Sequence, residues 1–135
     1  MDNAPSPTVD LATSAITPSR AALWTGRVLT GLIAAFLLFD AIGKLVPVAP
    51  VVEATQKLGF APGTIRPIGA LLAVSTVLHL VPRTQFVGAV LLTAYLGGAT
   101  ATHVHTGTPF WFSVAMGVLL WIAYVLRQPL VRAVL

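Results

Sequence analysis

Long stretches of the chain carry no charged residue, and these stretches predict its helices. No Asp, Glu, Lys or Arg occurs from Thr84 to Leu126. As a single α-helix this stretch would measure about 64 Å, roughly twice the thickness of the hydrocarbon core of a bilayer. The polar segment His103–Pro109, which contains a glycine and ends in a proline, divides it. The pattern therefore predicts two membrane-spanning helices, at about 84–103 and 109–127.

Two earlier apolar stretches predict two more membrane-spanning helices. The first covers about 22–45 and is followed by two prolines, which end a helix. The second covers about 66–82 and is flanked by Arg66 and Arg83. It is slightly short for a bilayer, but the arginine side chains can reach outward to the membrane surface and compensate for this.

The segments outside these four spans are of two kinds. Between the first two spans, Val51–Phe60 carries apolar residues together with Glu53 and Lys57, which are spaced to meet on one helix face. We expect a short interfacial helix there, lying along the membrane surface. Residues 1–20 contain prolines and scattered polar residues and are expected to form a disordered tail. The predicted fold is all-α, a four-helix transmembrane bundle formed by residues 21–135.

The composition supports a membrane location and excludes several classes of function. Charged residues make up 9% of the chain and hydrophobic residues 56%, whereas a typical soluble domain has about 25% charged residues. The chain contains no cysteine, which rules out a disulfide framework, a thiolate metal site and cysteine-based redox chemistry. Its Lys and Arg residues form no basic run, so nucleic acid is not an expected partner.

The distribution of basic residues predicts how the protein lies in the membrane. With four spans, both termini share one side with the turn between the second and third spans. That side holds five of the eight basic residues, and the opposite side holds Lys44, Lys57 and Arg66. Because basic residues are enriched on the cytoplasmic side, we expect a multi-pass protein of the plasma membrane with both termini in the cytoplasm.

Asp40 and Lys44 are the leading candidates for a functional site. They are one helical turn apart near the end of the first span, so they share a helix face. Asp40 is expected about 7–10 Å inside the end of that span. A carboxylate at this depth is unfavourable unless it is paired or faces a wet cavity. The two residues therefore form either a structural ion pair or part of a site for a polar head group or a proton.

The predicted topology brings three further polar residues to the same side of the membrane. His103 and His105 end the third span, and Arg66 begins the second. Each has a simpler role, the histidines as hydrogen-bonding residues at the interface and the arginine as a membrane anchor. The expected ligand-binding group consists of Asp40, Lys44, Arg66, His103 and His105. A metal site is not expected, since the two histidines have no carboxylate beside them. His79 lies near the opposite face and is expected to form hydrogen bonds at the interface.

Small residues predict where the helices meet, because burying leucine against leucine drives little association within lipid. The third span supplies most of them, and the expected helix-packing residues are Ala94, Gly97, Gly98 and Ala101. The first span has a similar stripe that begins at Gly26, and the second span contributes Gly69. The glycine pair is expected to serve packing, or else to open the backbone to a ligand.

Several segments of the chain resemble the DoxX-like family of small four-helix membrane proteins. They are PRTQFVGAVLLTAYLGGATATH (82–103), HTGTPF (105–110), the ending GVLLWIAYVLRQPLVRAVL and the first-span exit FDAIGKL. The resemblance covers about residues 27–132, and the element Gly-Gly-Ala-x-Ala-Thr-His at 97–103 is its most specific part. The matching positions are Gly43, Lys44, Pro82, Arg83, Gly97, Gly98, His103 and Arg127. Family members often carry a glutamate within the second span, whereas residues 67–82 hold no carboxylate.

The resemblance implies a polytopic membrane protein, usually bacterial, from a family whose members are associated with membrane redox systems, including quinone-linked sulfur oxidation. Our first hypothesis is a protein that supports a redox process by binding a quinone or another lipid-like ligand at the site described above. No recognised catalytic arrangement is present, so any enzymatic role would be that of an oxidoreductase-associated subunit. The alternative is a non-enzymatic assembly subunit whose small-residue faces dock a membrane partner, a redox enzyme or a second copy. A proton or solute path would need acids at mid-membrane, which spans two to four lack.

Overall fold

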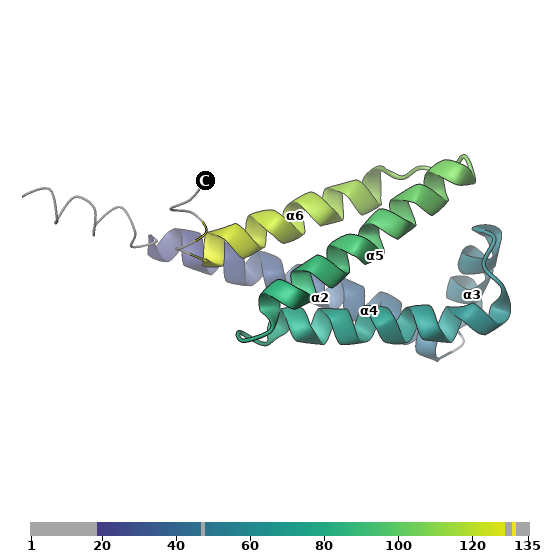
Figure 1. Ribbon diagram of the computed structural model, residues 1–135, viewed down its shortest axis with the longest axis horizontal. Coiled ribbons are helices and arrows are strands. Elements are labelled where there is room, and N and C mark those ends of the chain that lie inside the picture. Colours follow the sequence, from purple (N-terminus) through teal and green to yellow (C-terminus); the bar gives the residue numbers. More distant parts are fainter. Residues whose placement is uncertain (1–18, 47, 129–130, 132–135) are drawn as a thin grey trace, which may run out of the picture.

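The computed structural model describes residues 19–46, 48–128 and 131, and within this part of the chain every regular element is a helix (Figure 1). The expected all-α fold is confirmed. Residues 1–18, to which most of the expected tail belongs, lie outside the described residues. The elements are α2 (Arg20–Leu45), α3 (Ala49–Lys57), the 3-10 helix η1 (Pro62–Thr64), α4 (Ile65–Leu80), α5 (Gln85–His105) and α6 (Trp111–Arg127).

The ends of the first two helices follow from local hydrogen bonding and proline. The Ser19 hydroxyl accepts a hydrogen bond from the Ala22 backbone N–H at 3.2 Å, so α2 begins at Arg20. Residue 20 is therefore helical and does not belong to the tail. Lys44 lies in the last turn of α2, where a cation is favoured by the helix dipole. A proline in the first turn of α3 starts the short helix that was expected between the first two spans.

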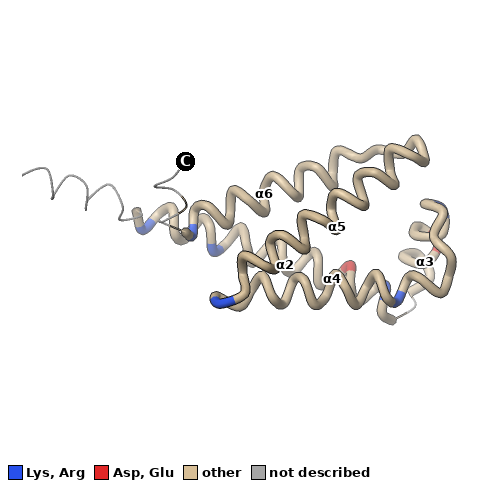
Figure 2. Tube along the Cα trace, viewed as in Figure 1, with Lys and Arg blue, Asp and Glu red and all other residues tan. Residues whose placement is uncertain are grey.

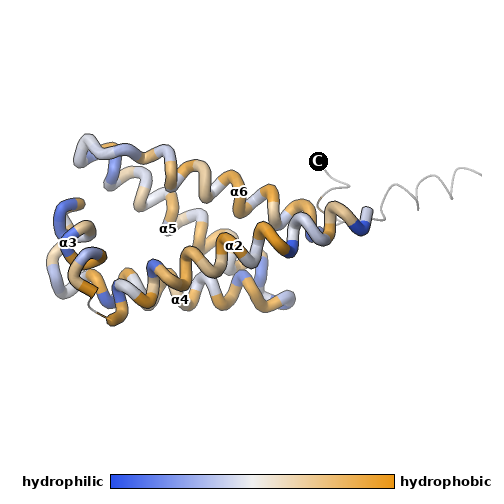
Figure 3. The backbone as a smooth tube through the Cα atoms, turned by 180° about the vertical axis from the view of Figure 1, so that it is seen from behind, coloured by the Kyte–Doolittle hydropathy of each residue, from blue (hydrophilic) through white to orange (hydrophobic). Residues whose placement is uncertain are grey.

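Three helices are long and apolar enough to cross a membrane, namely α2, the η1–α4 unit over Pro62–Leu80, and α5. The fourth, α6, is apolar but has only 17 residues, which corresponds to about 26 Å. A crossing by α6 stays a prediction, and α6 packs along α2 and α5. Figure 3 shows hydrophobic residues along all four long helices and hydrophilic residues mostly toward the two ends of the bundle.

The four long helices form a ring in which neighbours are α2 with α4, α4 with α5, α5 with α6, and α6 with α2. Each helix contributes buried apolar side chains to one central cluster, among them Leu37, Leu72, Leu92 and Leu120. Because the opposite surfaces of the helices carry many exposed large hydrophobic residues, the outside of the ring suits lipid contact.

The ring is tight at one end and open at the other. Near the α4–α5 turn, a Cβ atom added at Gly88 would overlap the backbone of His79, and one added at Gly26 would lie 2.8 Å from Arg127 Cγ. The buried residues of α5 all lie between Gly88 and Leu96, and none belongs to its last nine residues. Figure 1 shows α5 and α6 diverging from α4 toward the end where α3 lies. The helices thus enclose a wedge that widens toward α3.

Because of this wedge, the small residues of α5 border open space. Ala94, Gly97, Gly98 and Ala101 are all exposed, and a Cβ atom added at either glycine would meet no described atom within 4 Å. Neither glycine packs closely against another helix of this chain, which differs from our expectation, because α5 diverges from α4 at this level. A packing role for Ala94 and Ala101 stays a prediction. Close packing is provided instead by Gly26, Gly88 and Gly69. At Gly69, an added Cβ would lie 2.7 Å from Lys44 Cβ.

Candidate functional site

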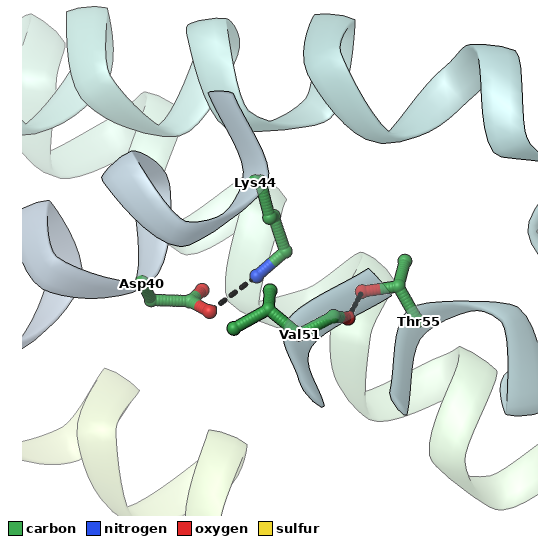
Figure 4. Close-up of polar contacts among 4 residues, drawn as sticks. All are labelled: Asp40, Lys44, Val51 and Thr55. Atoms are coloured by element: carbon green, nitrogen blue, oxygen red, sulfur yellow. Dashed lines mark hydrogen bonds and ion pairs between the residues drawn. The ribbon is translucent and has the colours of Figure 1, made fainter. Parts of the chain in front are cut away.

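Asp40 and Lys44 form the expected ion pair at the wide end of the wedge (Figure 4). The Lys44 ammonium donates a hydrogen bond to the Asp40 carboxylate within the same helix. The side chain of Lys44 is 10% exposed and that of Asp40 30% exposed. Each charge is therefore largely withdrawn from solvent and is balanced by the other, which is the condition for keeping ionised groups within a membrane helix.

Two glycines allow neighbouring helices to enclose the last turn of α2. Gly69 of α4 lies against the base of the Lys44 side chain, and the backbone at Gly43 lies against Val51 of α3, whose Cγ2 would be 2.9 Å from an added Cβ. Figure 4 shows Val51 beside the ion pair, and the Thr55 hydroxyl donates to the Val51 carbonyl at 2.7 Å. The Lys44 stem is thus held between α4 and α3, and its ammonium is directed to Asp40.

Tyr95 of α5 is a polar neighbour of this pair that the sequence did not reveal. It is half-buried, and its side chain lies beside Asp40. The two residues are far apart in the chain and on helices that are not neighbours in the ring, so no spacing rule connects them. The sequence offered only one signal, a tyrosine near the middle of an uncharged span.

His103 lies at the end of α5, where the α5–α6 turn fixes its ring. His103 Nδ1 and the Thr108 hydroxyl are hydrogen-bonded at 2.8 Å, and the Thr106 hydroxyl donates to the Thr102 carbonyl at 2.9 Å. The closing residue, Gly107, has a φ of +68°, a conformation that favours glycine. Since Nδ1 is bonded within the turn, Nε2 is the ring nitrogen available to a ligand.

The wedge encloses a cavity of about 800 Å³, which we call the wedge cavity. All four long helices and α3 contribute to its wall. Asp40, Lys44, Tyr95 and His103 supply polar groups, and most of the remaining lining is apolar, including Phe36, Leu71, Leu91 and Phe112. This volume lies within the range of pockets that bind small organic molecules, and such pockets are mostly apolar with a few polar groups.

The structure does not bring the whole expected group together. Arg66 and His105 are exposed and are not part of the lining of the wedge cavity. His105 follows His103 by two residues, so the two side chains leave α5 about 200° apart around the helix axis. Arg66 is in the first turn of α4 and its side chain points outward. The polar group of the cavity is thus Asp40, Lys44 and His103, joined by Tyr95.

A second polar cluster lies at the tight end of the ring. His79, which we expected to form hydrogen bonds at the interface, lies in the last turn of α4 and is 1% exposed. Its Nδ1–H donates to the Gln85 carbonyl at 3.1 Å, while Nε2 has no hydrogen-bond partner among the described residues. The Arg127 guanidinium donates to the Thr30 hydroxyl at 3.1 Å and to Gln85 Oε1 at 3.3 Å. These contacts join α2, α6 and the start of α5.

The long apolar helices and their lipid-suited outer surface define this chain as an integral membrane protein. A sequence model of the DoxX-like family matches residues 28–126, and the chain belongs to that family. No curated protein and no solved structure matches it. The matched region contains Asp40, Lys44, Tyr95 and His103, so the polar part of the wedge cavity lies inside the family region.

Proposed function

We propose that the protein binds an amphipathic, lipid-like ligand in the wedge cavity, that this ligand is a quinone, and that the protein thereby supports a redox process in the plasma membrane. The observation that carries the proposal is the cavity itself, which combines a volume of about 800 Å³ with apolar walls and one polar end. The redox part rests on the systems with which the DoxX-like family is associated.

A quinone suits the cavity because its ring is apolar on both faces and its edge carries two carbonyl oxygens. Lys44 Nζ can donate hydrogen bonds to such oxygens, and so can His103 in the tautomer that carries its hydrogen on Nε2. Phe36 and Phe112, whose rings lie edge to face at 5.2 Å, provide an aromatic wall for the ring. The charges of Asp40 and Lys44 cancel, so a neutral head group leaves the pair undisturbed, whereas a charged one would compete with it.

The adjacent glycines of α5 offer a matched test of ligand binding. Gly98 lines the wedge cavity and Gly97 does not, and at both positions an added Cβ has open space. We expect Gly98→Leu to abolish binding of a short-tailed ubiquinone analogue to the purified protein in nanodiscs, whereas Gly97→Leu leaves it unchanged. Binding by Gly98→Leu with the affinity of the original protein would exclude the wedge cavity as the site.

The second candidate function is that of an assembly subunit, and a groove on the outer face of α5 and α6 favours it. The groove has a volume of about 630 Å³ and is lined by Gly97, Gly117 and Trp121, among others. Small residues facing lipid allow another helix to approach closely. An assembly role predicts the opposite result for the two variants, namely that Gly97→Leu abolishes co-purification of a membrane partner and that Gly98→Leu retains it.

We also propose that both termini are cytoplasmic, as the distribution of basic residues favours. The wide end of the wedge, with Asp40 and His103, then lies toward the non-cytoplasmic surface. A quinone could enter from the lipid through the diverging helices and place its head group near that surface.

A further inference from the structure

Arg27 of α2 and Arg127 of α6 both lie where these two helices pack together, at the tight end of the ring and far from the wedge cavity. Gly26 brings α2 against α6 so closely that an added Cβ would lie 2.8 Å from Arg127 Cγ. The Arg127 guanidinium then reaches Thr30, which is one turn beyond Arg27 on α2. Arg27 is exposed and Arg127 is half-buried, and the Arg127 stem packs on Gly26, the residue next to Arg27.

The positive charge at this contact has no acidic partner among the described residues. Arg127 donates its hydrogen bonds to two neutral oxygens, those of Thr30 and Gln85. The ion pair between Lys44 and Asp40 is the only one in the described part of the chain, and it lies at the opposite end. Among the described residues, Figure 2 shows several basic residues and no acidic residue at the end where α2 begins and α6 ends.

Two like charges on packed helices at the edge of a membrane repel each other unless an anion accompanies them. A phosphate group can neutralise both guanidinium groups. Its oxygens accept charge-assisted hydrogen bonds, and the planar guanidinium group can donate two of them side by side. We propose that Arg27 and Arg127 form a phosphate-binding site at the α2–α6 contact. The phosphate belongs to an anionic phospholipid or is free in solution.

The neighbouring surface is compatible with a phospholipid. The Trp24 ring lies 5.9 Å from the Arg27 guanidinium and is 61% exposed, and Val28 on the next position of α2 is 55% exposed. An apolar surface directly beside the arginines can contact acyl chains while the arginines hold the phosphate. Basic pockets between membrane helices on the cytoplasmic side bind lipid head groups in this manner.

Lipid retention provides a direct test with the full chain purified in a mild detergent. Native mass spectrometry would measure how much phosphatidylglycerol and phosphatidylcholine remain bound, with inorganic phosphate as a third arm. We expect retention of phosphatidylglycerol over phosphatidylcholine, and a loss of about fivefold in Arg27→Gln. Displacement of the lipid by millimolar phosphate, or a rise in Tm with phosphate alone that Arg27→Gln removes, would assign the same site to free phosphate.

The matched control is Arg83→Gln, which removes an exposed arginine from the α4–α5 turn at the same end of the bundle. The proposed site predicts that this variant retains phosphatidylglycerol like the original protein. Equal losses in Arg27→Gln and Arg83→Gln would reduce the effect to general surface charge and overturn the proposal. Unchanged retention of phosphatidylglycerol in Arg27→Gln would also overturn it.

Discussion

Lys44 and Asp40 show how a membrane helix can keep two charges inside a bundle. Lys44 packs its stem against Gly69 and directs its ammonium back along α2 to Asp40. Each residue alone would be an uncompensated charge in surroundings of low polarity. The pair is therefore required for stability whether or not a ligand binds beside it, and these two roles can be separated by mutation.

We expect Asp40→Asn to lower the free energy of unfolding by about 2–4 kcal/mol, because it leaves the Lys44 ammonium buried without its counter-charge. The double variant Asp40→Asn with Lys44→Gln removes both charges and should recover to within about 1 kcal/mol of the original protein. Unfolding in mixed micelles measures both values. A double variant as unstable as Asp40→Asn would show that the pairing of charges is not what matters there.

Thr30 and Thr76 offer a comparison at the tight end of the ring. Both are buried and both donate to a carbonyl of their own helix, but Thr30 also accepts a hydrogen bond from Arg127. We expect Thr30→Val to reduce stability by about 1–2 kcal/mol, because a bond to a charged group is lost. Thr76→Val should cost no more than about 0.5 kcal/mol, since only the local bond disappears. If thermal unfolding showed the same loss of stability in Thr30→Val and Thr76→Val, the hydrogen bond from Arg127 to Thr30 would not be stabilising, which would contradict this account.

The sequence identified some of these residues and not others for a physical reason. The pairing of Asp40 with Lys44 was predictable because it depends on helical spacing within one element. The places of Tyr95 beside Asp40 and of His79 inside the bundle depend on how separate helices are rotated about their axes. That rotation follows from packing between elements, and sequence spacing within one span does not determine it.

At the scale of elements, glycines decide where helices approach and where they separate. Gly88 lets α5 lie directly on the end of α4, whereas Gly97 and Gly98 lie where α5 has left the bundle. Charge-free stretches and prolines predicted the helices themselves. The wedge was not predictable, because the stripe of small residues in the third span has the same pattern whether it faces a helix or lipid.

We expect Gly88→Ala to reduce stability by about 2–3 kcal/mol, because the new methyl group would overlap the backbone of His79 and push α5 away from α4. Gly98→Ala is the control, since its methyl group meets open space and alanine favours the helix, so stability should stay the same or rise by up to about 1 kcal/mol. Unfolding in mixed micelles again provides the measurement. A tolerated Gly88→Ala would contradict the close contact of α4 and α5.

At the scale of the whole molecule, polar groups are sorted to the two ends of a bundle whose outer surface is apolar. One end gathers Asp40, Lys44 and His103 around the wedge cavity, and the other gathers His79, Arg27 and Arg127. This sorting depends on all four long helices crossing the membrane. The weakest of them by length is α6, which has 17 residues.

Labelling of single cysteines tests the four crossings most directly, since the natural chain contains no cysteine. Three positions suffice: Arg83→Cys in the α4–α5 turn, His105→Cys at the end of α5, and Gln128→Cys after α6. A membrane-impermeant maleimide applied to intact cells should label position 105 alone, and positions 83 and 128 should react only after permeabilisation. Labelling of position 128 together with position 105 in intact cells would mean that α6 does not cross, and it would contradict the four-span bundle.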